Sequence, residues 1–519
     1  MQTDAKQQNK KITFLETAAI CSLVIGFFAF FSGLWYCSAY GDVGFDSILF
    51  TLTNGTKGVG GGLIYDYLLR AALPAVLCSV AGVIFVLYRG KLKWVMRFGK
   101  KGIPLFPIKR VTALALSLVT GVGLLLLAAG FTGLGTYVNA VATEGSIYEK
   151  HYVSPEHVEI LFPEKKQNLI YIFLESMENT YMSEEAGGGA AEDLIPELAQ
   201  LGRENISFSH KDGLGGFHST TGTTWTTGAL IGITAGIHLQ VPTSIDPEEY
   251  DLYYDCFLPG AKGITDVLHE VGYRQTVMFG SDASFGGRRE YFTQHGVDTI
   301  FDIFTARERG LVPEDYFQWW GFEDEKLFEY AKTELETLSQ SSEPFALYLL
   351  TADTHFPDGY LCPDCPDAYE EQYENVIACS SKRVYAFVQW LLEQPFMENT
   401  TVVISGDHRT MDNTYISECV DDDYVRTQYN CFINAKAEPV STQNRGMTPF
   451  DMFPSTLAAM GCTISGERLG LGTNLFSGKQ TVLEKYGSLE TLDLELAYYS
   501  EYYHEHFAAT LPKERTTLP

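Results

Sequence analysis

Three long apolar segments near the start of the chain constrain its fold more than any other feature. They cover residues 14–36, 66–88 and 111–131. About 20 apolar residues cross a bilayer as a helix, and each segment has that length. A buried core helix could explain any one of them, but three at the start and none later favour membrane spans. We therefore predict a membrane domain over residues 1–131.

The charged residues around these segments predict an orientation. The loop from 89 to 110 holds eight Lys and Arg and no acidic residue. Positive loops stay in the cytoplasm, so this loop and the N-terminus are expected inside and everything after about residue 132 outside. The first segment is long and has no clean cleavage site, so it should stay as an anchor. These features predict a multi-pass protein of the cell membrane with an extracytoplasmic body.

The extracytoplasmic part is strongly acidic. From residue 132 onward, 24 Lys and Arg stand against 60 Asp and Glu, a net charge of −36. The whole chain has a net charge of −28, which argues against a nucleic acid as partner, because nucleic acids bind basic surfaces. An acidic body also gives no long-range attraction to an anionic substrate, so local cations must bind one.

Seven of the ten cysteines lie in this outer part, where disulfides are permitted. Cys362 and Cys365 stand in YLCPDCPD, with Cys379 close behind. A CxxC pair without a second pair is weak evidence for zinc. We therefore expect structural disulfides, with at least one of the seven thiols free or paired elsewhere. The seven residues are Cys256, Cys362, Cys365, Cys379, Cys419, Cys431 and Cys462.

The outer body has the pattern of an α/β fold. Short apolar runs without alternation are typical of strands buried on both faces. Amphipathic stretches between them, such as 323–340 and 380–393, indicate helices on both sides of a mostly parallel sheet. We place a linker at 132–166, the body at 167–519, and a packed C-terminal helix within 480–510, where His504 and His506 are expected at the surface. The predicted strands are 168–174, 275–280, 344–350 and 400–406.

Polar residues follow each predicted strand. In open α/β sheets, sites lie beyond the carboxyl ends of the strands. A single acidic residue there is more often a helix cap. Polar or charged residues after all four predicted strands, however, favour one shared site. The residues concerned are Glu175 after the first strand, Ser281, Asp282 and Arg288 after the second, Asp353 and His355 after the third, and Asp407 and His408 after the fourth.

Glu175, Asp407 and His408 combine carboxylate oxygens with an imidazole, a set that suits Mn²⁺, Mg²⁺ or Zn²⁺. The stretch 213–236 is rich in glycine and threonine and ends in a potential helix. A hydroxyl at a helix N-terminus lies among free N–H groups that bind phosphate, and a metal can activate it as a nucleophile. A flexible loop with a cap explains the same residues equally well.

Taken together, these stretches resemble the lipoteichoic acid synthase and phosphoglycerol transferase family, which is sulfatase-like and belongs to the alkaline-phosphatase superfamily. The resemblance covers about 165–477 and is closest to the transferases that modify periplasmic glucans. It implies an α/β fold with N-terminal transmembrane helices followed by an extracellular sulfatase-like domain. It rests on NLIYIFLESME, TGTTWTTGALIG, FGSDASFGGRREYFTQHG, LTADTHFPDGY, VVISGDH and RLGLGTNLF.

The resemblance also implies roles for single residues. The LES motif gives a metal-binding Glu175, and TGTTWT gives Thr226 as nucleophile and fourth metal ligand, with Thr223, Thr224 and Thr227 as near alternatives. The GDH motif gives the metal ligands Asp407 and His408. Arg288 and Trp225 are expected to bind substrate, and His355 to hold the phosphate or donate a proton. The cofactor implied is a divalent cation, Mn²⁺ before Mg²⁺ or Zn²⁺.

Two departures favour the glucan-modifying branch over polymer synthesis. The synthases carry a tryptophan two residues before the arginine, where this chain has Gly286. They also have five spans against three here, although the glycine-rich segment 42–64 could dip into the membrane.

The function implied is transfer of glycerol phosphate from phosphatidylglycerol, through a phosphothreonine intermediate, to an extracytoplasmic glycan or polyglycerolphosphate acceptor. A phosphoethanolamine transferase of the same superfamily is the alternative enzyme, and a catalytically dead membrane scaffold is the alternative outside enzymes. A sulfatase would need Cys or Ser followed by Pro and Arg for its formylglycine, whereas the chain reads WTTGAL around Thr226.

Overall fold

The computed structural model describes residues 2–40, 44–46, 48–49, 61–88, 95–98, 101–104, 110–240, 257–421 and 423–508. The chain divides into two compact units. The first contains the N-terminal helices, and the second contains the sheet and the rest of the chain after residue 138. We describe each unit separately.

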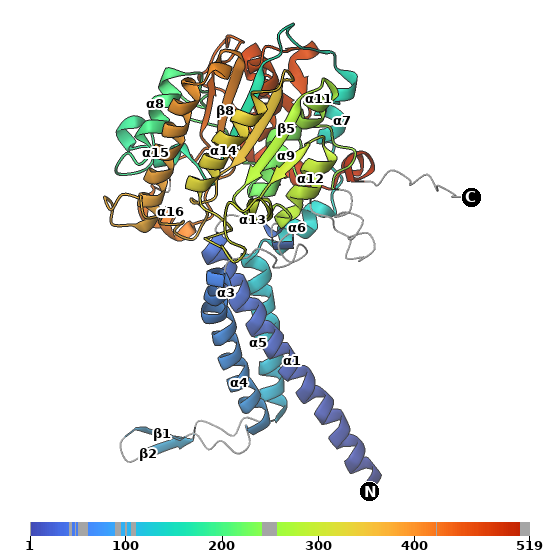
Figure 1. Ribbon diagram of the computed structural model, residues 1–519. Coiled ribbons are helices and arrows are strands. Elements are labelled where there is room, and N and C mark those ends of the chain that lie inside the picture. Colours follow the sequence, from blue (N-terminus) through green and yellow to red (C-terminus); the bar gives the residue numbers. More distant parts are fainter. Residues whose placement is uncertain are drawn as a thin grey trace, which may run out of the picture. The chain divides into compact units, whose positions relative to one another are not determined.

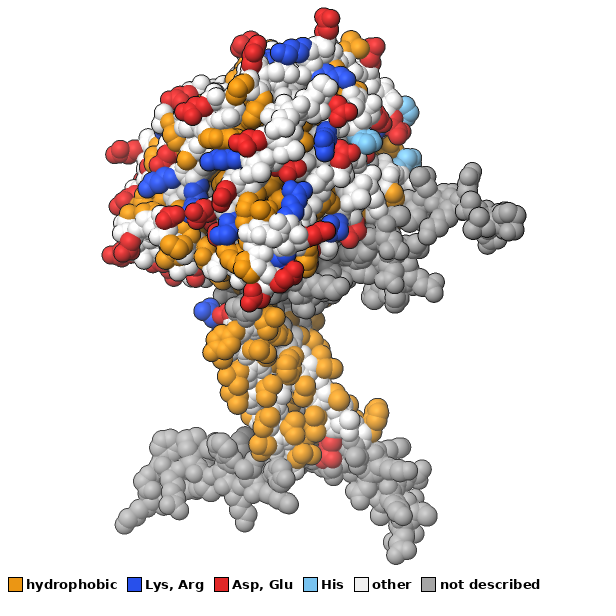
Figure 2. All heavy atoms as spheres, viewed as in Figure 1, with side chains coloured by type: hydrophobic (Ala, Val, Ile, Leu, Met, Phe, Trp, Pro, Cys, Tyr) orange, Lys and Arg blue, Asp and Glu red, His pale blue; other side chains and the backbone are white. Residues whose placement is uncertain are grey.

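Three helices of the first unit are long and apolar enough to cross a membrane, over 14–40, 64–87 and 111–131. The prediction of three long apolar helices is confirmed, and the 42–64 segment lies mostly outside the described residues. Figure 2 shows hydrophobic side chains covering the visible face of these helices, as expected for a surface that faces lipid. The elements are α1 (Gln2–Tyr40), α3 (Gly61–Tyr67), a π-helical turn η1 (Leu68–Ala72), α4 (Leu73–Tyr88), α5 (Arg110–Phe131), and the hairpin of β1 (Val95–Phe98) and β2 (Lys101–Pro104).

Small residues let α1 and α5 approach closely. A Cβ added to Gly26 would lie 2.6 Å from the carbonyl oxygen of Gly121, and one added to Gly121 would lie 2.4 Å from that of Ser22. Close backbone contact through small residues is how helices associate where lipid removes the hydrophobic drive. The π-helical turn η1 precedes Pro74, whose ring would otherwise clash with the carbonyl of Arg70 in a regular helix.

A six-stranded sheet forms the centre of the second unit, in the order β6-β5-β7-β4-β8-β9 (Figure 1). All neighbours are parallel except β8 and β9, which are antiparallel. This confirms the prediction of a mostly parallel α/β sheet. The strands are β4 (Asn168–Leu174), β5 (Arg274–Phe279), β6 (Thr299–Phe301), β7 (Phe345–Leu350), β8 (Thr400–Gly406) and β9 (Asn430–Ile433).

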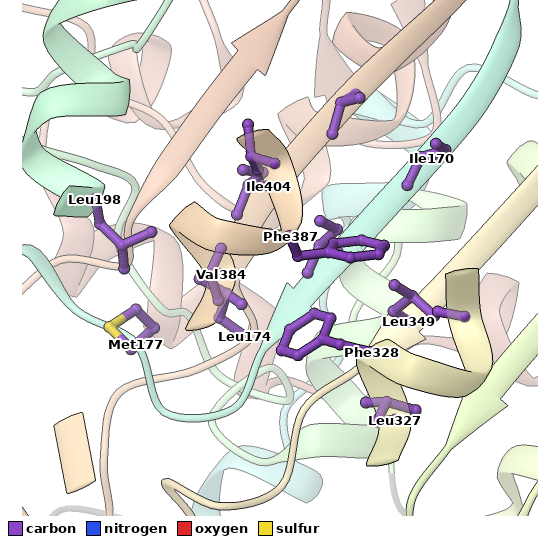
Figure 3. Close-up of a cluster of buried hydrophobic side chains, with 14 of the residues drawn as sticks. Ile170, Leu174, Met177, Leu198, Leu327, Phe328, Leu349, Val384, Phe387 and Ile404 are labelled. Carbon is purple, nitrogen blue, oxygen red and sulfur yellow. The ribbon is translucent and has the colours of Figure 1, made fainter. Parts of the chain in front are cut away.

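Side chains alternate across β4 into two apolar layers. Ile170, Ile172 and Leu174 join one buried core. The same core contains Phe328 of α14 (Asp324–Leu338) and Phe387 of α15 (Gln372–Leu392), which Figure 3 shows close to Ile170 and Leu174. On the opposite face Phe292 of α12 packs on rings from β5 and β7. Burial on both faces explains why β4 is apolar or aromatic after Asn168.

Helices connect the strands, as predicted, and only their ends differ from expectation. The predicted helix 380–393 begins earlier, at Gln372, and 323–340 becomes 324–338. The helices are α8 (Pro196–Glu204), α9 (Thr226–Ala235), α11 (Ile264–Glu270), α12 (Arg288–Gln294), α13 (Ile303–Glu308), α14 (Asp324–Leu338), α15 (Gln372–Leu392), α16 (Asn413–Cys419) and α17 (Met452–Ala459).

Residues 139–166, assigned from sequence to a linker, form part of the second unit. Tyr148 in α7 (Ile147–His151) is 1% exposed, and its hydroxyl lies 2.7 Å from Nδ1 of His238. The strand β3 (Ile160–Leu161) pairs with β10 (Thr463–Ile464). This segment begins within α6 (Leu134–Val141), and the boundary between linker and body stays a prediction.

The C-terminal stretch is not one helix, which corrects the sequence prediction. It forms α18 (Val482–Tyr486), α19 (Leu489–Ala497), α20 (Glu501–Tyr503) and the π-helical η10 (His504–Ala508). Gly487 adopts a left-handed conformation with φ 72°, which ends α18, and Ser488 caps the next helix. Tyr503 is buried, whereas His506 is exposed and His504 partly exposed.

The prediction of structural disulfides is wrong for the described cysteines, which are all free. Cys419, Cys431 and Cys462 have no cysteine partner among the described residues because the fold distributes them over α16, β9 and the turn after α17. Cys256 lies outside the described residues. Cys362, Cys365 and Cys379 do come together, although without forming a disulfide.

Candidate active site

The candidate residues follow four neighbouring strands and lie at one edge of the sheet. In the order β5, β7, β4 and β8, their carboxyl ends lead to Arg288, to His355, to Glu175, and to Asp407 with His408. The parallel arrangement of these strands places all four ends at the same edge. The sequence places the residues only after strands, and the strand order brings them together.

Glu175, Asp407 and His408 form a buried cluster whose ligand atoms all lie within 4.8 Å of one another. The Nε2 atom of His408 lies 3.4 Å from Oε1 of Glu175 and 3.5 Å from Oδ2 of Asp407. Two carboxylates and one imidazole at this spacing can share one ion. The structure therefore brings together the three side chains that the sequence assigned to a metal.

Neighbouring groups fix the orientation of each side chain in the cluster. Nδ1 of His408 lies 2.8 Å from the carbonyl oxygen of Arg409, so it carries the proton and Nε2 keeps its lone pair for the cluster. Ser176 donates its hydroxyl to Oε1 of Glu175 and its backbone N–H to Oδ1 of Asp407. Contacts of this kind are typical of the groups that orient metal ligands.

The electrostatics of the cluster fit a divalent cation. Oδ2 of Asp407 is buried and accepts no hydrogen bond from the described residues, which is costly for a carboxylate unless a cation compensates. Burial, together with the neighbouring Glu175, raises the pKa of Asp407 to about 7. Burial also acts to raise the pKa of Glu175, but His408 and His355 outweigh it and lower that pKa. The residues present therefore suit a bound cation.

Thr226 lies against this cluster as the first residue of α9. Its hydroxyl is 3.4 Å from Oε2 of Glu175 and 3.3 Å from Nε2 of His408. The alternatives Thr223 and Thr227 are buried, and the Thr223 hydroxyl donates to the carbonyl of Thr220. Because the first N–H groups of a helix have no intrahelical acceptor, Thr226 stands where a phosphate would be stabilised.

Thr226 and Glu175 share a small pocket with Arg288 and His355. Arg288 donates through Nη2 to the hydroxyl of Ser281 and the carbonyl of Asp282, and through Nε to the carbonyl of Phe285. These bonds hold the guanidinium in the pocket wall. Burial lowers the pKa of Arg288 to about 10, so it remains a cation at neutral pH.

His355 completes the pocket on the side of β7. Its Nδ1 lies 2.7 Å from the carbonyl oxygen of Phe356, which leaves Nε2 for the pocket. Burial lowers the pKa of His355, so the ring is neutral at rest. The indole of Trp320 packs on it with ring centroids 4.5 Å apart. Asp353, from the same strand end, is not in the cluster, because its carboxylate accepts from the N-terminus of α14.

Two positions behave differently from the sequence interpretation. Trp225 is buried as the N-cap of α9 and is not among the residues that line the pocket. Gly286 has φ 66° and Gly287 has φ 75°, a left-handed turn that aims Arg288 and disfavours a bulky residue. Sequence reasoning assigned no role to Ser176 of the LES motif or to Phe285 of the FGSDASFGGRREYFTQHG stretch. It also missed Trp320, whose aromatic side chain lines the pocket without any motif to mark it.

Comparison with known proteins shows the family to which the matched region belongs. A protein-family model described as Sulfatase matches residues 167–462, a range that begins beside β4 and includes all the residues of the site. Phosphoglycerol transferase I of Escherichia coli (strain 55989 / EAEC) is 28% identical over 401 residues, which are 75% of this chain and 48% of that protein. Phosphoglycerol transferase I of Citrobacter koseri is 29% identical over 402 residues, with the same coverage.

The chain thus spans about half the length of the curated relatives it matches. Among solved structures, the lipoteichoic acid synthase LtaP from Listeria monocytogenes is 18% identical, with a TM-score of 0.45, over 64% of this chain and 81% of that chain.

Proposed function

We propose that this chain, which belongs to the sulfatase family of the alkaline-phosphatase superfamily, is a membrane-anchored, metal-dependent phosphoglycerol transferase with an extracytoplasmic active site. The observation that carries the proposal is the position of Thr226, with its hydroxyl between Glu175 and His408 at the start of α9. Similarity to the two transferases supports the group transferred. The three apolar helices would keep the site near lipid headgroups.

Glu175, Asp407, His408 and Thr226 would hold the divalent cation, for which we propose Mn²⁺. Such an ion lowers the pKa of a bound hydroxyl and neutralises charge on phosphate oxygens. The donor proposed is phosphatidylglycerol, and the acceptor is the hydroxyl of an extracytoplasmic glycan or polyglycerolphosphate. Threonine at the nucleophile position, in WTTGAL, supports transfer through phosphothreonine rather than sulfate-ester hydrolysis.

In the first half of the proposed reaction, Thr226, Arg288 and His355 have different roles. Thr226 Oγ1 forms the new bond to phosphorus while the bond from phosphorus to the diacylglycerol oxygen breaks. Arg288 stabilises the negative charge that develops on the phosphoryl oxygens. The Thr226 proton passes to solvent. His355 holds the phosphate or delivers a proton, taken up from solvent on Nε2, to the departing diacylglycerol oxygen. In the second half an acceptor hydroxyl replaces diacylglycerol and restores the threonine.

The test uses the full chain in detergent with Mn²⁺ and phosphatidylglycerol labelled in the headgroup, followed by peptide mass spectrometry. We expect a phosphoglycerol adduct on Thr226 and release of diacylglycerol. Both should be absent from Thr226→Ala and present in Thr224→Ala, a matched change of a neighbouring, partly exposed threonine.

A parallel reaction with labelled phosphatidylethanolamine distinguishes the donors. An adduct from phosphatidylethanolamine alone would make the protein a phosphoethanolamine transferase. No adduct from either lipid, in a folded and metal-loaded sample, would contradict transfer and leave a scaffold without catalytic activity.

A further inference from the structure

Three cysteines of the second unit form a cluster between the loop that follows β7 and helix α15. Cys362 and Cys365 lie in the loop that follows β7 and His355, and Cys379 lies within α15. Sγ of Cys362 is 3.2 Å from Sγ of Cys365 and 3.7 Å from Sγ of Cys379. One sulfur from each residue lies within 4.8 Å of the others. The chain therefore brings a CxxC pair and a distant third thiol to one point.

The spacing of the sulfurs suits a single metal ion. Zinc bonds to thiolate sulfur at about 2.3 Å, so two sulfurs of a tetrahedral site lie about 3.8 Å apart. Cys362 is 3% exposed and Cys379 6% exposed, whereas Cys365 is partly exposed. Two ligands would thus be enclosed, and the fourth position would open on the side of Cys365.

Arg383 is a second, independent feature of this cluster. It lies one turn after Cys379 on α15, and it donates through Nη2 to Sγ of Cys362 at 3.0 Å and through Nε to Sγ of Cys379 at 3.5 Å. A guanidinium directed at two sulfurs favours the thiolate form that a metal ion binds. Three thiolates around a divalent ion leave one net negative charge, which this cation would balance.

We propose that Cys362, Cys365 and Cys379 bind one zinc ion as thiolates, separate from the cation beside Thr226. Soft thiolates select zinc, whereas the carboxylate-rich cluster of Glu175 and Asp407 suits harder ions. Binding releases the three thiol protons to solvent. The exposed Asp364, whose Oδ2 lies 3.7 Å from Nη2 of Arg383, is a carboxylate that could take the fourth position.

The zinc ion would fasten the loop that carries His355 to helix α15. At its start this loop is held by Asp353, which accepts from the backbone N–H of Asp324, and by Thr354, whose carbonyl accepts from Tyr373 in α15. The cysteines would supply a covalent attachment further along the same loop. Loss of the ion should therefore loosen His355 while the ligands beside Thr226 stay in place.

The experiment measures metal content in the full chain, purified in detergent without chelator and then equilibrated with Zn²⁺ and Mn²⁺ before removal of loosely bound ions. We expect the wild type to retain one zinc equivalent that Cys379→Ser lacks. Glu175→Gln should keep that zinc and lose the other ion. Cys431→Ser, which changes a buried cysteine in β9, is the matched control and should keep both.

A second measurement uses only the wild-type chain, so its result does not depend on whether the variants fold. Cobalt loaded into the wild-type chain should give the intense near-ultraviolet absorption of thiolate-to-metal charge transfer, and Zn²⁺ should displace it. Absence of that band, zinc content unchanged in Cys379→Ser, or a disulfide between any two of the three cysteines in unreduced peptides would each overturn the proposal. None of these results depends on transferase activity, so this proposal and the proposed function fail separately.

Discussion

At the scale of single residues, the site combines backbone strain with an unsatisfied charge. Ser176, directly after Glu175, has φ 54°, a left-handed conformation that non-glycine residues rarely adopt. Its two hydrogen bonds to Glu175 and Asp407 compensate for that strain. Strain and orphaned polar atoms concentrate where function requires a fixed geometry. The cluster should therefore destabilise the metal-free protein.

The variant Asp407→Asn tests whether the buried carboxylate destabilises the metal-free protein. The amide removes a buried charge that repels Glu175, so the metal-free variant should unfold at a higher temperature than the metal-free wild type. Mn²⁺ at 100 times its Kd should stabilise the wild type by about 2.7 kcal/mol and the variant far less. Thermal unfolding with and without Mn²⁺ measures both effects.

Asp451→Asn is the matched control, because Asp451 is also buried but both of its carboxylate oxygens accept hydrogen bonds. It should lower the unfolding temperature and leave the response to Mn²⁺ intact. An Asp407→Asn variant that responds to Mn²⁺ like the wild type would remove Asp407 from the ligand set.

Arg288 supports a second prediction at this scale. Its guanidinium lies 4.7 Å from the ring centroid of Phe279 and donates in three directions, a geometry that the single ammonium of lysine cannot reproduce. Loss of a hydrogen bond to a charged group costs about 1.5–3 kcal/mol. Arg288→Lys should therefore lower kcat/KM by roughly 10- to 100-fold, close to the effect of Arg288→Ala.

Arg289→Lys is the comparison for Arg288→Lys. Arg289 is the next residue on α12, but it pairs with Asp302 and does not line the pocket. Steady-state kinetics of headgroup release from the lipid donor gives both values. Retention of wild-type kcat/KM by Arg288→Lys would argue against contact with the phosphoryl group.

At the scale of elements, the loop after β7 is fastened to α14 by a pair of carboxylates. Asp324 accepts from the backbone N–H groups of Ala352 and Asp353, and Asp353 accepts from that of Asp324. Burial raises the pKa of Asp324 to about 7. Burial, followed by repulsion from Asp324, raises the pKa of Asp353 to about 9. The folded pair therefore keeps a proton at neutral pH.

This pair predicts a pH dependence of stability. An unfolded aspartate has a pKa of about 3.9, so between pH 4 and about 9 the folded pair binds more protons than the unfolded chain. The free energy of unfolding contributed by the pair should fall as pH rises through that window. Asp353→Asn removes one titrating group but keeps an acceptor oxygen, so its unfolding temperature should fall less between pH 6 and 9.

Unfolding temperatures at several pH values, for the full chain in one detergent, test this expectation. Asp315→Asn changes an exposed aspartate before α14 and should follow the wild-type profile. Parallel profiles for the wild type and Asp353→Asn would show that the pair does not control the pH dependence.

At the scale of the whole molecule, the second unit includes residues that precede the matched sulfatase region. The backbone of Val153 exchanges two hydrogen bonds with Gly470, and Gly145 donates to Tyr499. Together with buried Tyr148, these contacts join the segment after residue 138 to the C-terminal part of the same unit. The folded unit is therefore larger than the family match.

A comparison of two fragments tests this conclusion. A fragment of residues 139–508 should fold cooperatively, whereas one of residues 167–508 should be less stable. Removing one large buried aromatic costs about 3–5 kcal/mol, and the shorter fragment also loses β3. Denaturant unfolding of both fragments measures the difference.

Two point changes in the full chain separate packing from hydrogen bonding. Tyr148→Ala should cost about 3–5 kcal/mol. Tyr148→Phe, which keeps the ring but loses the bond to His238, should cost about 1 kcal/mol. Equal stability of the fragments 139–508 and 167–508 would instead show that residues 139–166 act only as a linker.

Much of this organisation can be read from local patterns. Apolar runs of membrane length predicted three spans. Runs of β-branched and aromatic residues predicted strands such as 168–174 and 400–406, because a strand that is buried on both faces is rich in such residues. Glu175, Asp407 and His408 were indicated by their positions directly after predicted strands. Thr226 was singled out from its neighbouring threonines only by the family resemblance of TGTTWT.

Other features follow only from the tertiary structure. The strand order places β4 between β7 and β8, which brings Glu175 beside Asp407 and His355. Only folding shows that Trp225 is buried, that Trp320 packs on His355, and that Asp353 fastens a helix. The sequence alone determined which residues could carry the chemistry, because residue type and neighbouring elements are local properties. Their distances, burial and partners were decided by the tertiary structure, because these depend on segments far apart in the chain.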